Sequence, residues 1–201
     1  MDTLGTVLLL FAVGAIIAFP ISGRSTSTRG SAPVTTFFGL FFCVTVPMLT
    51  FSPNVWWLAL SLTLYGLANG GVDVAMNAQG VEIELATGKK IMGSLHGFYS
   101  LGGLIGAGTG ALAAWLDTRL EWHFTTLSVL GFGIMAWAAT GLIQDRTREG
   151  TKPESGGFVI PPRILWPLGI IAFCSALGEG AMADWSALYL HEHLGSRESV
   201  A

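Results

Sequence analysis

The stretch VTTFFGLFFCVTVPMLTF, Val34–Phe51, decides the fold class. It has no charged side chain, and it lies inside a longer segment, residues 30–72, that contains no Asp, Glu, Lys or Arg. A helix needs about 20 mainly apolar residues, at about 1.5 Å rise each, to cross the hydrocarbon core of a bilayer. This stretch therefore predicts a membrane-spanning helix.

The composition of the whole chain agrees with that prediction. Of 201 residues, 51% are hydrophobic and only 11% are charged, whereas about a quarter of the residues in a soluble domain are charged. The mean hydropathy is +0.60. The net charge is −3 and no basic block is present, so nucleic acid is not an expected partner.

Further apolar runs lie on both sides of the first. Short polar segments separate them, and in lipid only a helix satisfies its own backbone groups. We therefore expect an all-α polytopic membrane bundle of six transmembrane helices, the other five being Leu4–Ser22, Val55–Gln79, Ile91–Leu116, Trp122–Ile143 and Ile164–Leu190.

Basic residues predict the orientation of this bundle. Eight of the ten Lys and Arg residues fall in three segments, residues 23–33, 80–90 and 144–163. Loops rich in Lys and Arg stay in the cytoplasm, so we expect these three loops to be cytoplasmic and both termini to lie outside.

That orientation leads to an expectation about the extent of the chain. The first span would enter from outside, although no cleavable signal precedes it, and the chain stops at SRESVA soon after the sixth span. We expect a partial chain. Residues 1–143 would form most of an N-terminal lobe, 144–163 a cytoplasmic linker, and 164–201 the first helix of a second lobe.

Polar residues within the apolar runs are the candidate site. Asn69, Asp73 and Asn77 are spaced by four and so share one helix face. An Asp at the centre of a membrane helix costs about 2.5–3.5 kcal/mol. This face therefore points either to a polar cavity or, because Asp73 comes late in its span, to the cytoplasmic headgroups.

The next apolar run has a polar face of its own. In IMGSLHGFYSLGG, His96, Tyr99, Ser100 and Gly103 follow helical spacing. Asp73 and His96 flank the same cytoplasmic loop. His96 is either a partner that exchanges protons with Asp73 or a packing histidine with its polar atoms satisfied.

The last run, GEGAMADWSALYL, holds two acids. Glu179 and Asp184 are five residues apart, about 140° around an ideal helix, so they share a face only if the helix unwinds near Gly178. Trp185 is either an anchor at the membrane interface or a stacking platform for a solute.

No motif for catalysis or a cofactor is present. The chain has no Walker loop, no HExxH and no GxSxG, so we expect neither an enzyme nor a cofactor. His191 and His193 lie on opposite sides of a helix and would bind a metal poorly, so no metal site is expected.

Small residues recur at intervals of four in several runs. Such spacing lets membrane helices approach closely, either for static packing or for helices that slide past one another. The sets are Gly14-x3-Ala18-x3-Ser22, Gly66-x3-Gly70, Gly93-x3-Gly97 and Gly102-x3-Gly106-x3-Gly110.

Two stretches resemble a known family. GLANGGVDVAMNAQGVEIE followed by GKKIMGSLHGFYSLGGLIGAGTGALAA resembles helices four and five of the major facilitator superfamily, in its fucose-permease-like bacterial branch near the YbjJ-type inner-membrane proteins. GEGAMADWSALYL resembles helix seven of that branch. The similarity extends over nearly the whole chain, from helix two to helix seven.

The resemblance implies a twelve-helix transporter of the bacterial inner membrane with two lobes and alternating access. In sugar-transporting relatives an acid at the position of Asp73 is associated with proton coupling, and a polar residue at the position of Tyr99 helps to bind sugar. The family's loop between helices two and three reads here GRSTSTRGSAP, with Ser27 in the place of an acid.

We therefore expect secondary active transport of a small polar solute, sugar-like or another metabolite, coupled to protons. The expected partners are the lipid bilayer, the solute, protons, and the missing helices or another chain. An alternative is a truncated, non-transporting membrane fragment or assembly partner. The candidates for proton coupling are Asp73, Glu179 and His96, and those for the solute path are Asn69, Asn77, Tyr99, Asp184 and Trp185.

Overall fold

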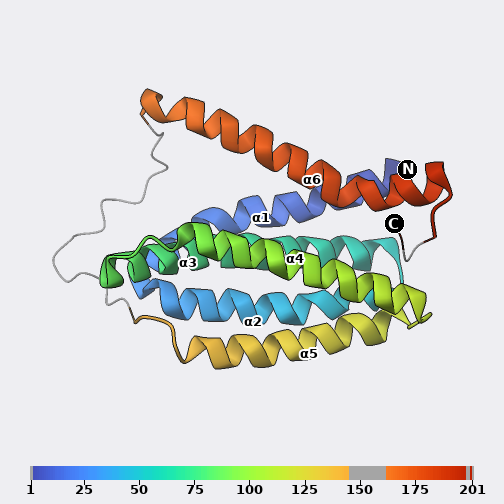
Figure 1. The fold of residues 1–201 in the computed structure, drawn as a ribbon, viewed down its shortest axis with the longest axis horizontal. Helices are drawn as coiled ribbons and strands as arrows, with labels where there is room; N and C mark the ends of the chain where they lie inside the picture. Colours follow the sequence, from blue (N-terminus) through green and yellow to red (C-terminus); the bar gives the residue numbers. More distant parts are fainter. Residues whose placement is uncertain (1, 145–161, 198–199, 201) are drawn as a thin grey trace. The chain divides into compact units, whose positions relative to one another are not determined.

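The fold is taken from a computed structural model that describes residues 2–144, 162–197 and 200, with only the backbone described for residues 2–4 and 184. Within these ranges the chain is helical and no strand occurs, so the expected all-α class is confirmed. The elements are α1 (Asp2–Arg29), α2 (Ser31–Thr50), α3 (Val55–Thr87), α4 (Met92–Trp115), α5 (Leu120–Ala139), η1 (Arg163–Leu165) and α6 (Trp166–Leu194) (Figure 1).

Each apolar run forms one long helix, but two of the expected cytoplasmic loops are wrong in extent. α1 continues to Arg29 and α3 continues to Thr87, so segments 23–33 and 80–90 are largely helical. In α1 the hydroxyls of the polar stretch bond back to the preceding turn, as when Thr28 Oγ1 donates to Arg24 O at 2.9 Å. These bonds satisfy the hydroxyls within the helix, which continues through the Ser- and Thr-rich stretch to Arg29. Gly30, at φ 89°, breaks it.

Four of the described helical segments are long and apolar enough to cross a membrane by length and composition. They lie in α1, α2, α3 and the η1–α6 region, where the segment is Arg163–Ala183. α4 and α5 have 24 and 20 residues but are not among the four. Seven of the 24 residues of α4 are glycines, which carry no apolar side chain, so α4 has little apolar side-chain surface for its length.

Glycines bring α1 and α3 into close contact. A side chain added at Gly66 would collide with the backbone of Phe11, and one at Gly14 with the backbone of Thr63. A Cβ at Gly70 would lie 2.7 Å from Ala15 O. The two backbones therefore meet because these positions carry no side chain, as small-residue spacing in membrane helices favours.

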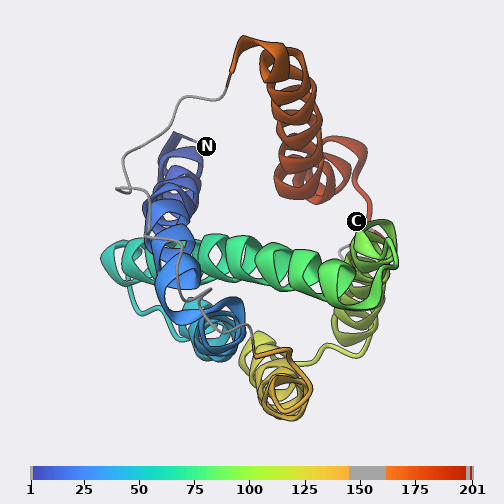
Figure 2. The ribbon, with the colours of Figure 1, turned by 90° about the vertical axis from the view of Figure 1, so that its left-hand side faces the viewer.

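α2 contacts both α3 and α5. Its Phe38 lies over Gly71 of α3 and forms a buried core with Val34 and Ala75. Toward α5, Gly39 meets the Met135 side chain, and Ser128 Oγ donates to Cys43 O. In the turned view α2 and α5 are seen nearly end-on, while α3 is seen along its length as it crosses α1 (Figure 2).

The chain divides into two compact units. Met1–Gly102 and Arg119–Glu154 form the first, and Gly103–Thr118 and Ser155–Ala201 form the second. The residues Asn69 to Tyr99 of the candidate site belong to the first unit, whereas Glu179, Asp184 and Trp185 belong to the second. The lobe and linker boundaries expected from the sequence stay a prediction, since residues 145–161 of the linker lie outside the described ranges.

Candidate functional site

The acid of α3 is held by the amide one turn later. Asn77 Nδ2 donates to Asp73 Oδ1 at 3.1 Å and to Asp73 O at 2.8 Å. Because α3 is helical throughout, Asn69 lies one turn before Asp73 on the same face. The carboxylate is thereby oriented by a neutral donor.

This polar face is turned away from α2. Gly71 and Ala75 lie two residues on either side of Asp73, hence nearly opposite on the helix, and both are buried. Gly71 lies under Phe38, and Ala75 belongs to the α2–α3 core. Asp73 is exposed, so its carboxylate is free to face a polar space.

α4 begins beside α3 and carries the second polar set. Met92 and Leu95 approach within about 3 Å of where a Cβ would stand on Gly80. Farther along, Tyr99 is within electrostatic range of Tyr65 on α3. The first turn of α4 therefore lies beside α3, and Tyr99 farther along is exposed.

His96 is exposed, and in this conformation it has no bond to the α3 acid. Ser100 Oγ donates to His96 O at 3.2 Å, a backbone contact within α4. Among the described residues, no hydrogen bond or ion pair connects the His96 ring with Asp73. Proton exchange between the two stays a prediction.

α6 runs without interruption past both glycines that flank its acid. It is helical from Trp166 to Leu194, so the unwinding considered near Gly178 is not present. Glu179 and Trp185 are exposed, and the side chain of Asp184 lies outside the described part of the chain. Without unwinding, positions 179 and 184 stay about 140° apart around the axis of α6.

His191 and His193 lie in the last turn of α6. His193 stacks on Tyr189 with ring centroids 5.1 Å apart, and His191 Nδ1 lies 3.0 Å from Ser196 O. Over the described ranges, no group of three His, Cys, Asp or Glu side chains is placed to hold a metal ion.

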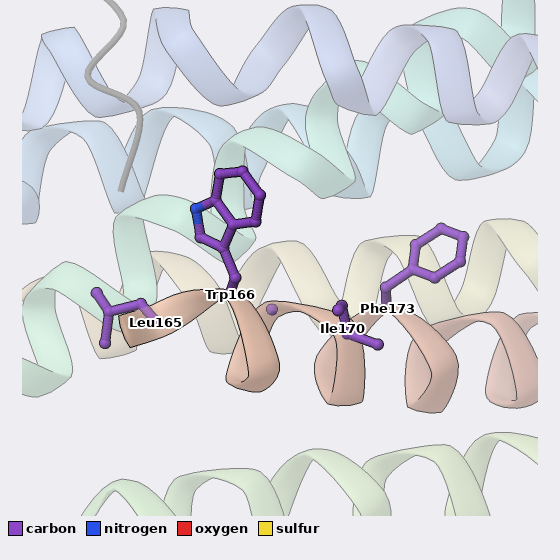
Figure 3. Close-up of a pocket in the computed structure, with 5 residues that line it drawn as sticks. Leu165, Trp166, Ile170 and Phe173 are labelled. Carbon is purple, nitrogen blue, oxygen red and sulfur yellow. The ribbon is translucent and has the colours of Figure 1, made fainter. Parts of the chain in front are cut away.

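An apolar hollow lies at the start of α6. Leu165, Trp166, Gly169, Ile170 and Phe173 line it, and all come from one short stretch of chain (Figure 3). None of them carries a charge, so this hollow is suited to apolar contact and offers little to a polar solute.

Two polar residues that the sequence analysis did not single out connect helices. The first is Gln79, which is 3% exposed on α3. Ser31 Oγ donates to Gln79 Oε1 at 2.6 Å, and Gln79 Nε2 donates to Ile143 O at 3.2 Å. This amide therefore joins the start of α2, the last third of α3 and the segment after α5.

The second is Glu84, near the end of α3. Its Oε1 accepts from Ile91 N at 2.6 Å and from Met92 N at 3.0 Å, across the turn made by Gly88 at φ 68°. Those N–H groups open α4, where a helix leaves its donors unpaired. An acid seven residues before an apolar run was the available signal.

Glu84 follows the Val55–Gln79 run that is expected to span the membrane. α3 has 33 residues, a length of about 50 Å, against about 30 Å of hydrocarbon. The N–H groups of Met92 and then Ile91, with Lys90 nearby, hold the pKa of the Glu84 carboxyl below its usual range. Glu84 therefore binds the start of α4 as a carboxylate.

Comparison with known proteins gives one family and several relatives. Residues 1–201 match the model of the Major Facilitator Superfamily. The chain is 37% identical to an uncharacterised transporter, y4wD, of Sinorhizobium fredii over 98% of this chain and 52% of that protein. It is 32% identical to an uncharacterised MFS-type transporter of Yersinia pestis, over 99% of this chain and 51% of the relative.

A third relative is the membrane protein MosC of Rhizobium meliloti, at 31% identity over 93% of this chain and 45% of that protein. The chain thus spans about half the length of these curated relatives. No solved structure matches it significantly.

Proposed function

Because this chain belongs to the Major Facilitator Superfamily, we propose that it forms part of a secondary active transporter that moves a small polar solute by alternating access, coupled to protons. The observation that supports this most is the carboxylate of Asp73 on a membrane helix, oriented by Asn77 and turned away from the α2 core. An acid in such a place is costly unless it serves a polar path.

The remaining roles follow the chemistry of each group. Asp73 binds the coupling proton, with His96 as a neighbouring relay and Glu179 as a second acid in the other unit. The solute path is formed by polar and aromatic groups that hydrogen-bond or stack against a sugar-like metabolite: Asn69, Asn77, Tyr99, Asp184 and Trp185.

Uptake by a chain extended to the full length of its relatives tests the coupling. Asp73→Asn removes the titrating group and keeps the size and the contact with Asn77. We expect loss of the pH dependence of uptake and at least a tenfold loss of rate under a proton gradient. Glu82→Gln, which neutralises an acid nine residues later on α3, is the matched control and should retain both the rate and its pH dependence. Unchanged pH dependence in Asp73→Asn would sink the coupling role.

A second candidate is a non-transporting membrane fragment or assembly partner. Its support is the coverage, since the chain spans about half of each relative. Uptake into vesicles separates the two. If the extended chain transports and the 201-residue chain does not, the site is functional and this chain alone is inactive. Uptake by the 201-residue chain alone would contradict the hypothesis that this chain is a non-transporting fragment.

We further propose placement in the bacterial inner membrane within the fucose-permease-like branch, with segments 23–33, 80–90 and 144–163 in the cytoplasm. The bias of Lys and Arg toward these segments supports this orientation. Cysteines introduced one at a time at Ser27 and Thr118, in a chain whose Cys43 and Cys174 are replaced by Ser, test it. A membrane-impermeant reagent should label the first only in inverted vesicles and the second only in right-side-out ones, and the reverse pattern would contradict the orientation.

A further inference from the structure

A groove runs between the end of α1 and the start of α2. It has a volume of about 270 Å³ and is lined by Ile21, Ser25, Arg29, Pro33, Val34, Phe37 and Phe38. Five of these side chains are apolar. Along α1, eight residues separate Ile21 from Arg29, a rise of about 12 Å. The groove therefore leads from the apolar part of α1 to its charged end.

Arg29 lies at the end of this groove, and no ion pair is recorded for it among the described residues. Across residues 2–144 and 162–197, the structure records one ion pair, between Arg119 and Glu121. The neighbouring hydroxyls bond to the backbone of their own helix. Ser27 Oγ and Thr28 Oγ1 both donate to Arg24 O at 2.9 Å. The guanidinium is thus available to an anion from outside the described chain.

Depth and charge together identify the occupant. An apolar groove that ends at a fixed positive charge, on a helix that crosses the membrane, matches a lipid whose phosphate lies at the interface and whose tail lies below it. Basic pockets between membrane helices bind anionic lipid headgroups in this way. An anionic lipid contacts both parts of this groove, because its phosphate reaches the cation and its acyl chain covers the apolar side chains, whereas a free anion would contact the cation alone.

We propose that this groove binds an anionic phospholipid. The phosphodiester accepts hydrogen bonds from the Arg29 guanidinium and the Ser25 hydroxyl, and the first part of one acyl chain lies along Ile21, Val34 and Phe37. The site is independent of the transport proposal, since none of these residues belongs to the solute path.

Lipid binding to the purified 201-residue chain in detergent tests the site. The probes are phosphatidylglycerol and phosphatidylcholine with identical acyl chains, and bound lipid is counted by native mass spectrometry. We expect phosphatidylglycerol to bind at least about fivefold more tightly, the effect of one interfacial cation. Arg29→Gln should remove this preference, and Arg29→Lys should keep most of it.

Arg24→Gln is the matched control, because it removes the same charge from the same helix but from outside the groove. Equal loss of preference in Arg24→Gln and Arg29→Gln would overturn the site in favour of diffuse attraction. Ser25→Phe fills the groove and leaves both arginines, so it should also abolish binding. The same titrations on the chain extended to full length should retain the Arg29 dependence, and its loss there would mean that protein fills the groove.

Discussion

Two sets of glycines with the same four-residue spacing have opposite surroundings. At Gly14, Gly66 and Gly70 an added Cβ would meet backbone atoms of the facing helix. At Gly93 and Gly97 of α4, in the same unit, it would meet nothing within 4 Å. Gly106 and Gly110, in the second unit, are equally open within their own unit.

The comparison separates spacing from packing. Small residues permit close approach, but the approach also needs a partner helix whose surface fits. α1 and α3 supply each other with that partner. At Gly93 and Gly97 of α4, no such partner lies within the described part of the first unit.

The largest expected effect comes from filling the packed set. Gly66→Leu would place a side chain against the backbone of Phe11, which cannot turn aside as a side chain can. We expect α1 and α3 to separate locally and the free energy of unfolding to fall by about 3 kcal/mol or more. Unfolding of the purified chain in mixed micelles with increasing dodecyl sulfate measures this.

Gly97→Leu is the matched control on the open set. Leu has a better helix propensity than Gly and meets no neighbour here, so stability should be unchanged or rise by up to about 1 kcal/mol. If Gly97→Leu destabilises the 201-residue chain as much as Gly66→Leu does, the two sets do not differ and the comparison fails.

The same substitution sharpens the comparison in a full-length chain. If other helices cover α4 there, Gly97→Leu should overpack that interface and cost about 1–3 kcal/mol. The difference between short and extended chains, measured in the same micelles, is the quantity of interest. No difference would mean that the Gly97 side of α4 faces lipid or water in both.

The sequence predicts those structural features that depend on residues within a single helix. Apolar runs predict the long helices, and four-residue spacing predicts that Asn77 reaches Asp73. For the connectors the sequence offered no signal at Gln79 and only the spacing of Glu84 before an apolar run. Their roles depend on which backbone groups the neighbouring helices leave without partners, and that is settled only when the helices pack.

The next prediction concerns the hydrogen bonds by which Gln79 connects α3 to α2 and to the segment after α5. Gln79→Leu keeps a side chain of similar size but removes the hydrogen bonds to Ser31 Oγ and Ile143 O. We expect the free energy of unfolding to fall by about 1–2 kcal/mol. This is the range given by two hydrogen bonds, whose individual contributions differ between soluble proteins and membrane helices. Gln144→Leu, an exposed glutamine nearby, should change it by less than about 0.5 kcal/mol. Equal effects would show that the bonds of Gln79 contribute nothing particular.

The smallest effect concerns the link between the packed region and α4. Glu84→Gln weakens the acceptor for the Ile91 and Met92 N–H groups. Because the pKa of Glu84 is lowered in the folded chain, its contribution is present above the usual carboxyl range and is lost as pH falls through the lowered value. At neutral pH, amide exchange at Ile91 and Met92 should therefore be faster in Glu84→Gln than in the unmodified chain.

The pH dependence shows whether the charge of the Glu84 carboxylate or only the shape of its side chain holds the start of α4. As pH falls below about 4.5, the usual carboxyl value, the two chains should come to exchange alike, since Glu84 itself becomes protonated. Glu82→Gln, two residues earlier on α3, should match the unmodified chain at every pH. A difference between Glu84→Gln and the unmodified chain that stays constant down to pH 3 would mean that side-chain shape, and not charge, holds the start of α4.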